Sequence, residues 1–105
     1  MSGISTHILD TAAGIPAAGI QVHLFRGTDE LASETTNKDG RVAALLPTNA
    51  ALLAGTYRIT FDVGARWPEA FYPEVSVTFS VKDPRSHYHI PLLISPFGFT
   101  TYRGS

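Results

Sequence analysis

The sequence predicts an all-β protein, either an antiparallel sandwich or a barrel, with at most one short helix. Glycine and proline recur along the chain, and the runs between them are short and rich in β-branched and aromatic residues. In several runs apolar residues occupy every second position, which is the period of a strand with one buried face. At 105 residues the chain has the length of one domain, covering 1–105.

Eight strands are predicted from this alternation and from the turn residues that separate the runs. They cover residues 5–10, 20–26, 31–36, 41–46, 55–63, 75–81, 87–94 and 98–103. In the second of these, apolar Ile20, Val22 and Leu24 alternate with polar residues, so these three are expected to face the core. Strands 55–63 and 75–81 alternate in the same way.

Turn and breaker residues define the connections between the strands. Residues 11–19 are predicted to form a loop because glycine and proline interrupt them. The pair Asp39 and Gly40 predicts a tight turn, and strand 41–46 leaves that turn and stops at Pro47. No internal repeat or linker divides the chain.

The segment 64–72 is the one place where a short helix is expected. It would begin near Trp67, with Pro68 in its first turn, where the missing N–H of proline costs nothing. Pro73 prevents the helix from continuing.

Composition argues against several classes of function. A net charge of −1 argues against nucleic acid or an anionic membrane as a partner, because both select basic surfaces. With no cysteine, the chain has no disulfide, no thiolate nucleophile and no zinc–thiolate site. No apolar run is long enough to span a bilayer, and the N-terminus lacks the features of a secretory signal, so we expect a cytoplasmic protein. Charged residues make up only 16% of the chain, which favours an oligomer.

Strand alternation gathers histidines on outward faces. In the seventh strand, Tyr88 and Ile90 belong to the expected core face, which leaves His87 and His89 on the opposite face. Pro91 follows on that face and has no N–H to donate, so we expect an edge strand or a modified pairing there. An outward face of histidine, proline and leucine suits a subunit interface or a cleft.

Two further side chains could join these histidines. His7 lies on the outward face of the first strand beside apolar Leu9, and Arg41 comes directly after a turn, where a cation can reach over a neighbouring strand end. Taken alone, a strand histidine is usually an ordinary surface residue, and we expect this of His23. The residues by themselves therefore indicate a β-fold with a histidine-lined groove.

A metal site is the alternative interpretation of the two histidines of the seventh strand. His87 and His89 stand at positions i and i+2 and share a face, as some zinc sites require, and His7 could complete the set in space. No acidic residue or cysteine lies near enough in sequence to do so. We expect no metal and no other cofactor.

Four segments, taken in order, resemble the transthyretin-related proteins. They are Ser-Thr-His-Ile-Leu-Asp at 5–10, Asn-Lys-Asp-Gly-Arg at 37–41, His-Tyr-His-Ile-Pro-Leu-Leu-Ile-Ser-Pro at 87–96 and Tyr-Arg-Gly-Ser at 102–105. The resemblance covers essentially the whole chain. The closing Tyr-Arg-Gly-Ser is typical of the 5-hydroxyisourate hydrolases of this family and distinguishes them from transthyretin, which carries hormone.

The resemblance implies a fold, an assembly and a site. The fold is a sandwich of two four-stranded sheets with one short helix or helical turn, assembled as a homotetramer whose central channel is lined by the first and seventh strands. Segment 62–73 is short, so the connecting helix could be reduced to a turn. The catalytic residues implied are His7, Arg41 and His89. The substrate-binding residues implied are His87, Tyr102, Arg103, Gly104 and Ser105.

The activity implied is hydrolysis of 5-hydroxyisourate during urate degradation. A ring amide opens to give 2-oxo-4-hydroxy-4-carboxy-5-ureidoimidazoline, by metal-independent acid–base catalysis in which histidines are assisted by an arginine. Which histidine activates water stays open at this point. The alternative is a carrier or binding module with the same fold and no catalysis, which needs an apolar channel and no poised base.

Overall fold

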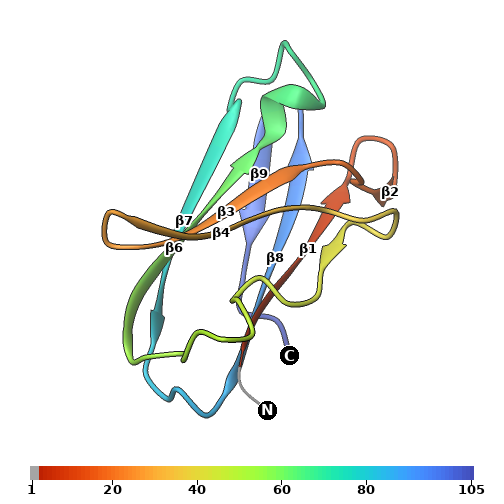
Figure 1. The fold of residues 1–105 in the computed structure, drawn as a ribbon. Helices are drawn as coiled ribbons and strands as arrows, with labels where there is room; N and C mark the ends of the chain where they lie inside the picture. The colour runs from red at the N-terminus through yellow and green to blue at the C-terminus, as the bar shows by residue number, and fades with distance from the viewer. Residues whose placement is uncertain (1–2) are drawn as a thin grey trace.

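The computed structural model describes residues 3–105 as two β-sheets packed face to face (Figure 1). The elements in chain order are β1 (Gly3–Asp10), β2 (Ile15–Pro16), β3 (Gln21–Arg26), β4 (Asp29–Thr35), β5 (Arg41–Val42), β6 (Gly55–Asp62), the 3₁₀ turn η1 (Val63–Ala65), β7 (Glu74–Val81), β8 (His87–Ser95) and β9 (Gly98–Thr101). One sheet has the order β2-β1-β8-β9, with β5 also paired to β1, and the other has the order β4-β3-β6-β7. The predicted all-β sandwich is confirmed.

The first sheet differs from the expected four strands at the outer edge of β1. Ile15–Pro16, inside the predicted loop 11–19, pairs with the end of β1 as β2, so this sheet has five strands within the described residues. The predicted strand 41–46 is wrong beyond its first two residues. The chain leaves the sheet after β5 because Leu45 and Leu46 turn into the core, where their exposed fractions are 1% and 9%.

The predicted helix near Trp67 is wrong, and its place is taken by the single turn η1. Val63 is buried at the end of β6 and its carbonyl accepts hydrogen bonds from the N–H groups of Arg66 and Trp67. The turn therefore lies at residues 63–65, before the expected helix start near Trp67, because buried Val63 anchors it there. Residues 66–73, which include Pro68 and Pro73, then form turns and bends, as the short segment suggested.

The core lies between the two sheets and follows the predicted alternation. The inward residues of β3, β6 and β8 are buried apolar side chains, whereas their neighbours in sequence face outward. The buried set includes Val22, Leu24, Tyr57, Ile59, Phe61, Tyr88, Ile90, Leu92 and Ile94. Since β1 and β8 are parallel neighbours, their outward residues meet on one face of the first sheet.

Pro91 lies in the middle of the first sheet, between β1 and the C-terminal segment. The expected edge strand is therefore wrong, but the expected modified pairing is confirmed. The β8–β9 register, continued towards the isolated bridge between His89 and Gly104, places Pro91 opposite Tyr102. Pro91 has no N–H, so the regular ladder stops at Thr101, whose hydroxyl donates a 2.8 Å hydrogen bond to the Pro91 carbonyl. This shortens the predicted strand 98–103.

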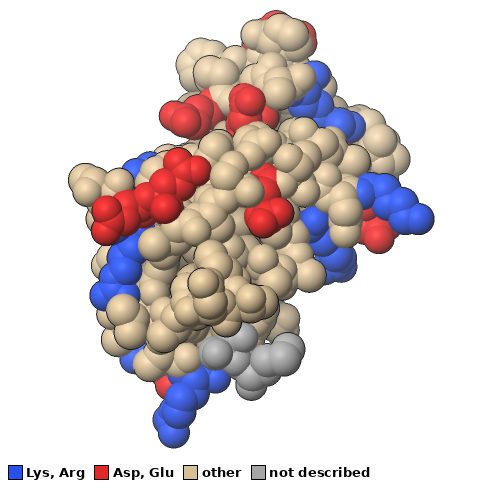
Figure 2. Space-filling model, in the orientation of Figure 1, with Lys and Arg blue, Asp and Glu red and all other residues tan. Residues whose placement is uncertain are grey.

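Charge is sparse and mixed on the surface. On the face shown in Figure 2, acidic side chains lie mainly over the middle and upper part and basic side chains mainly along the edges, with wide uncharged areas between them. Among residues 3–105, no helix has both the length and the apolar character needed to cross a membrane.

Candidate active site

Parallel pairing of β1 with β8 assembles a row of polar side chains on the outer face of the first sheet. In this register Ser5 stands opposite His89, Gly3 opposite His87, and His7 opposite Pro91. Three histidines from the two ends of the chain therefore occupy one face. The alternation of each strand predicted their outward direction, and the pairing brings them together.

The turn before β5 brings Arg41 to the same face. The Asn37 side chain accepts hydrogen bonds from the N–H groups of Asp39 and Arg41, and the N–H of Ile8 donates to the Gly40 carbonyl at 2.7 Å. Gly40 has a φ of 75°, and an added Cβ would meet the Ile8 carbonyl oxygen at 2.4 Å, so glycine is required for this approach. As a result, Arg41 pairs directly with His7 across β1 and β5.

Ser5 connects the two histidines of β8. Its Oγ lies 2.8 Å from Nε2 of His87 and 2.8 Å from Nδ1 of His89. Ser5 itself is only 8% exposed, so water competes little for these hydrogen bonds. The sequence placed Ser5 on the outward face but gave no reason to include it in the site, because that depends on how β1 and β8 pair.

The surroundings of His89 favour its neutral form. Burial lowers the pKa of His89 below the ordinary histidine value, and the Arg41 guanidinium and the neighbouring His7 and His87 rings lower this pKa further, while a hydrogen bond with the Ser5 backbone raises it. A neutral imidazole donates a hydrogen bond from its protonated ring nitrogen and accepts one at the other nitrogen. This is the state that acid–base chemistry needs.

The C-terminal segment closes one side of this face. Its N–H at Gly104 donates a 2.8 Å hydrogen bond to the His89 carbonyl, and a Cβ added at Gly104 would lie 2.5 Å from Cδ2 of His89. Only glycine lets the tail cross the imidazole so closely. The tail helps to bound an open cavity of about 340 Å³. The residues that line this cavity are Ser5, Thr6, Arg41, Ala43, His87, His89 and Ser105.

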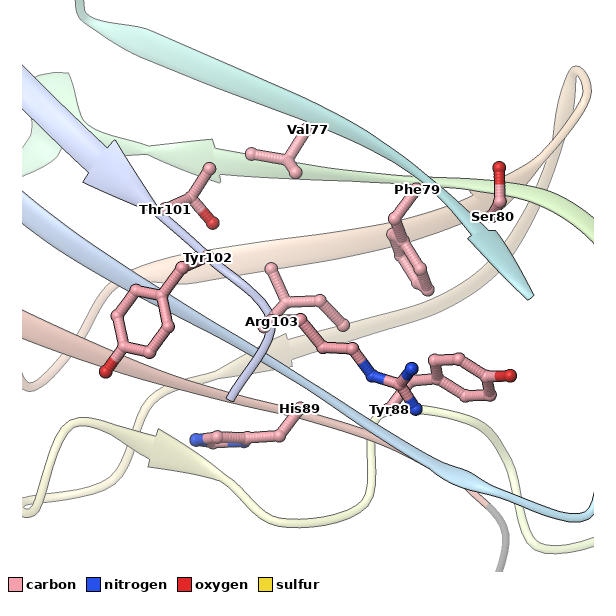
Figure 3. Close-up of a pocket in the computed structure, with 9 residues that line it drawn as sticks. Val77, Phe79, Ser80, Tyr88, His89, Thr101, Tyr102 and Arg103 are labelled. Carbon is pink, nitrogen blue, oxygen red and sulfur yellow. The ribbon is translucent and has the colours of Figure 1, made fainter. Parts of the chain in front are cut away.

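Tyr102 and Arg103 are not among the residues that line this cavity. The Arg103 guanidinium lies over the Tyr88 ring, 4.6 Å from its centroid, and Tyr102 is 57% exposed. Figure 3 shows Arg103 beside Tyr88, with His89 projecting in another direction. Of the predicted substrate-binding residues, His87 and Ser105 therefore line the cavity, Gly104 lies against the His89 ring, and Tyr102 and Arg103 lie beside the cavity. Their roles stay predictions.

A metal centre would need three ligands close together. Within residues 3–105, no three side chains of the His, Cys, Asp and Glu types gather closely enough to hold a metal ion. The two histidines first considered as a metal pair direct one nitrogen each at Ser5. The absence of a cofactor stays a prediction.

The fold and the site together define a transthyretin-like sandwich with histidines and an arginine on the outer face of one sheet. The chain belongs to the HIUase/Transthyretin family, whose pattern matches residues 4–104.

Individual relatives agree with this assignment. The chain is 42% identical to the mouse (Mus musculus) 5-hydroxyisourate hydrolase, with 99% of this chain and 96% of that protein covered. It is 41% identical to the Uric acid degradation bifunctional protein TTL of Arabidopsis thaliana, covering 97% of this chain but spanning 37% of that longer protein.

Solved structures give the same result. The structure of Klebsiella pneumoniae 5-hydroxyisourate hydrolase superposes with a TM-score of 0.90 at 40% identity, and all of both chains is covered. Sea bream transthyretin in complex with thyroxine superposes with a TM-score of 0.87 at 28% identity, covering 96% of this chain and 93% of that one. The backbone is thus nearly the same in both, and the sequence is more similar to the hydrolase.

Proposed function

We propose that this protein hydrolyses 5-hydroxyisourate in urate degradation, opening the ring amide to give 2-oxo-4-hydroxy-4-carboxy-5-ureidoimidazoline. The observation that carries the proposal is the neutral imidazole of His89 in one cavity with Arg41, next to His7. The 5-hydroxyisourate hydrolases named above, at 40% and 42% identity over nearly the full chain, support the same substrate.

The chemistry needs three contributions, and the site has a candidate for each. A base must take a proton from water, a positive group or donor must stabilise the oxyanion, and a proton must reach the leaving nitrogen. Between them, His7 and His89 supply the base and the proton or hydrogen-bond donor. Arg41 binds and polarises the oxygens of the planar substrate, because a guanidinium presents several donors in one plane. No metal takes part in this mechanism.

The C-terminal tail completes the substrate pocket in this proposal. Gly104 holds the tail against His89, and the hydroxyl or carboxylate of Ser105 reaches the cavity wall. Tyr102 and Arg103 bind substrate from beside the cavity. The apolar cavity of about 240 Å³ that they line, together with His89, adjoins the same segment (Figure 3).

The alternative is a carrier in the manner of transthyretin, a family member with the same backbone. A carrier is favoured by an apolar binding face. Here the face holds His7, Arg41 and His89, and burial together with the nearby Arg41 guanidinium lowers the pKa of one imidazole. Gathering these histidines and the arginine on one face lowers the stability of the fold and does not help a carrier to bind an apolar ligand. Catalysis is therefore the better-supported function.

An absorbance assay distinguishes these functions. Purified protein is mixed with freshly generated 5-hydroxyisourate, and the decay of substrate absorbance is followed with and without a chelator. We expect decay far faster than in buffer and no effect of the chelator. Decay at the buffer rate favours the carrier, and loss of activity with chelator favours a metal site.

We also propose a homotetramer in which the outer faces of β1 and β8 line a central channel. Support comes from half-buried Leu9 and Leu93 on that face and from two exposed residues, Phe97 in the turn before β9 and Phe99 on β9, which leave apolar surface for other copies to cover. Native mass spectrometry measures the number of subunits. The expected cytoplasmic location also stays a prediction, which cell fractionation tests.

A further inference from the structure

Ser5 has one hydroxyl proton and two histidine neighbours. Its Oγ is 2.8 Å from Nε2 of His87 and 2.8 Å from Nδ1 of His89, distances typical of strong hydrogen bonds. A serine hydroxyl donates one hydrogen bond and accepts others. These imidazoles are the only partners of the Ser5 hydroxyl among residues 3–105, so it donates its proton to one and accepts from the other, and the proton positions of the two rings are coupled.

The far nitrogen of His87 decides between the two arrangements. Nδ1 of His87 is buried and has no hydrogen-bond partner among residues 3–105. A Cβ built on Gly3 would lie 3.4 Å from this atom, so the chain packs against it and leaves little space for a water molecule. If Ser5 donated to His87, the proton of neutral His87 would sit on this buried nitrogen. Buried N–H groups without an acceptor are rare in proteins, and unpaired acceptors are less so.

The opposite arrangement avoids that buried donor. His87 then carries its proton on Nε2 and donates it to Ser5, and Ser5 donates its own proton to Nδ1 of His89. A neutral His89 must in turn carry its proton on Nε2. That nitrogen makes no hydrogen bond with the described residues and is not buried, so it stays open to an incoming molecule.

The geometry points to Ser5 as a positioning residue that links His87 to His89 and holds His89 in the tautomer with a protonated Nε2 at the cavity. Although Ser5 lines the cavity, it acts in this proposal through His89. Its partner on the far side, His87, is thereby an orienting group, and its buried Nδ1 is the reason that the chain of hydrogen bonds runs in one direction.

This inference rests on the proposed function and divides the roles of the two histidines. A neutral His89 with a proton on Nε2 donates a hydrogen bond to the developing oxyanion beside Arg41 and keeps its proton throughout. His7 takes the proton from water as the C–O bond forms. It returns that proton to the ring nitrogen as the C–N bond breaks, so charge and protons balance without changing Ser5 or His87.

Proton positions on the rings can be measured directly. In ¹⁵N-labelled full-length protein, long-range ¹H–¹⁵N correlation spectra distinguish protonated from unprotonated imidazole nitrogens, and a His89→Gln variant assigns the signals. Above the pH at which His89 titrates, we expect an unprotonated Nδ1 and a protonated Nε2. In Ser5→Ala we expect a mixture of the two tautomers, and in Ser5→Thr, which keeps a hydroxyl, the wild-type pattern.

Kinetics of the same variants give a second readout. Loss of a partner that orients a histidine costs about 10- to 100-fold in activity. We expect Ser5→Ala to lower kcat by that amount with little change in KM, and Ser5→Thr to recover most of it. Ser33→Ala is the matched control, since it removes a hydrogen-bonded strand hydroxyl from the outer face of the other sheet, and it should match wild type.

The outcomes distinguish an error in the role assigned to Ser5 from an error in the proposed function. A protonated Nδ1 on wild-type His89, or a tautomer pattern that Ser5→Ala leaves unchanged, overturns the assignment of Ser5. Equal loss of activity in Ser5→Ala and Ser5→Thr overturns it as well. If wild-type protein does not hydrolyse 5-hydroxyisourate, the proposed function fails, while the spectra still decide the hydrogen-bond direction.

Discussion

Both sheets of the sandwich carry histidine on their outer faces, and His23 of the second sheet and His89 of the first have opposite surroundings. His23 of β3 lies 2.9 Å from the carboxylate of Glu30 on β4, and the side chains of this pair are 33% and 45% exposed. His89 of β8 instead faces Arg41, His7 and His87 and makes its side-chain hydrogen bond to a nearly buried serine. A histidine on a strand therefore becomes a candidate catalyst through its neighbours and not through its position in the strand.

The two faces also differ in how they are covered. The outer face of the second sheet is formed by regular strands with polar, exposed side chains along β4. The site face is crossed at one side by β5, whose turn Gly40 allows, and at the other by the C-terminal segment, which Gly104 allows. Because Gly40 and Gly104 have no Cβ, the backbone can approach closely at both points. The histidines of this face are therefore partly enclosed, whereas His23 on the other face is not.

Substitution of His7, Arg41 or His89 by alanine should cause the largest loss of activity. Loss of a positioned acid–base group costs on the order of 10²–10⁴ in rate. We expect each variant to lose 5-hydroxyisourate hydrolysis by that order and to keep the wild-type circular dichroism spectrum and size-exclusion profile. Full turnover by His7→Ala would remove it from the mechanism.

Gly104→Ala should reduce activity by up to about 100-fold, the cost of a small misplacement at a reacting centre. The added Cβ would lie 2.5 Å from Cδ2 of His89 and 3.1 Å from Cγ of Pro91, so the tail or the imidazole must move. Gly98→Ala is the control, because its Cβ would meet nothing closer than 3.8 Å. Steady-state kinetics of both variants measure the difference, and equal activities contradict a role for the close contact.

The sequence predicted the sandwich well because alternation is a local property. Each inward residue of β3, β6 and β8 could be assigned from its neighbours, since a strand that places one apolar residue in the core places every second one there. The short strands β2 and β5 and the turn η1 were missed or misjudged. Their form depends on long-range packing: Leu45 leaves the sheet for the core, and Val63 anchors the turn.

The site could be predicted only in part. The outward direction of His7, His87 and His89 followed from alternation, but their meeting depends on parallel pairing between the two ends of the chain, which no local pattern specifies. The resemblance supplied that pairing indirectly, together with Arg41. Ser5 carries no signal of its own, because an outward serine on a strand is common and becomes informative only between two imidazoles.

Acid titration tests whether the surroundings of His89 lower its pKa. Since burial and then Arg41 lower the pKa of His89, the neutral imidazole persists as the pH falls below the ordinary histidine range and is lost only further into acid. Arg41→Ala removes one lowering cause, so the titration midpoint should rise towards the ordinary value without reaching it, because burial remains. NMR titration of the His89 ring protons measures this shift.

The groups that face His89 set the controls for that titration. Arg41 lies on β5, His7 on β1, His87 on the same strand, and Ser105 in the tail. Arg58→Ala removes a cation from the other sheet, where the guanidinium lies over Phe25, and should leave the His89 midpoint unchanged. A midpoint in Arg41→Ala that equals or falls below the wild-type value contradicts the electrostatic account.

His23→Ala should have the smallest effect and completes the comparison. Exposed pairs such as His23 and Glu30 contribute about 0.2–1 kcal/mol to the free energy of unfolding, because water screens them and both side chains lose freedom. We expect unchanged hydrolysis and a free energy of unfolding, from urea titration, lowered by no more than about 1 kcal/mol. A large loss of activity in His23→Ala with stability retained would mean that the outer face of the second sheet takes part in catalysis. The contrast between the two histidines would then no longer identify the active face.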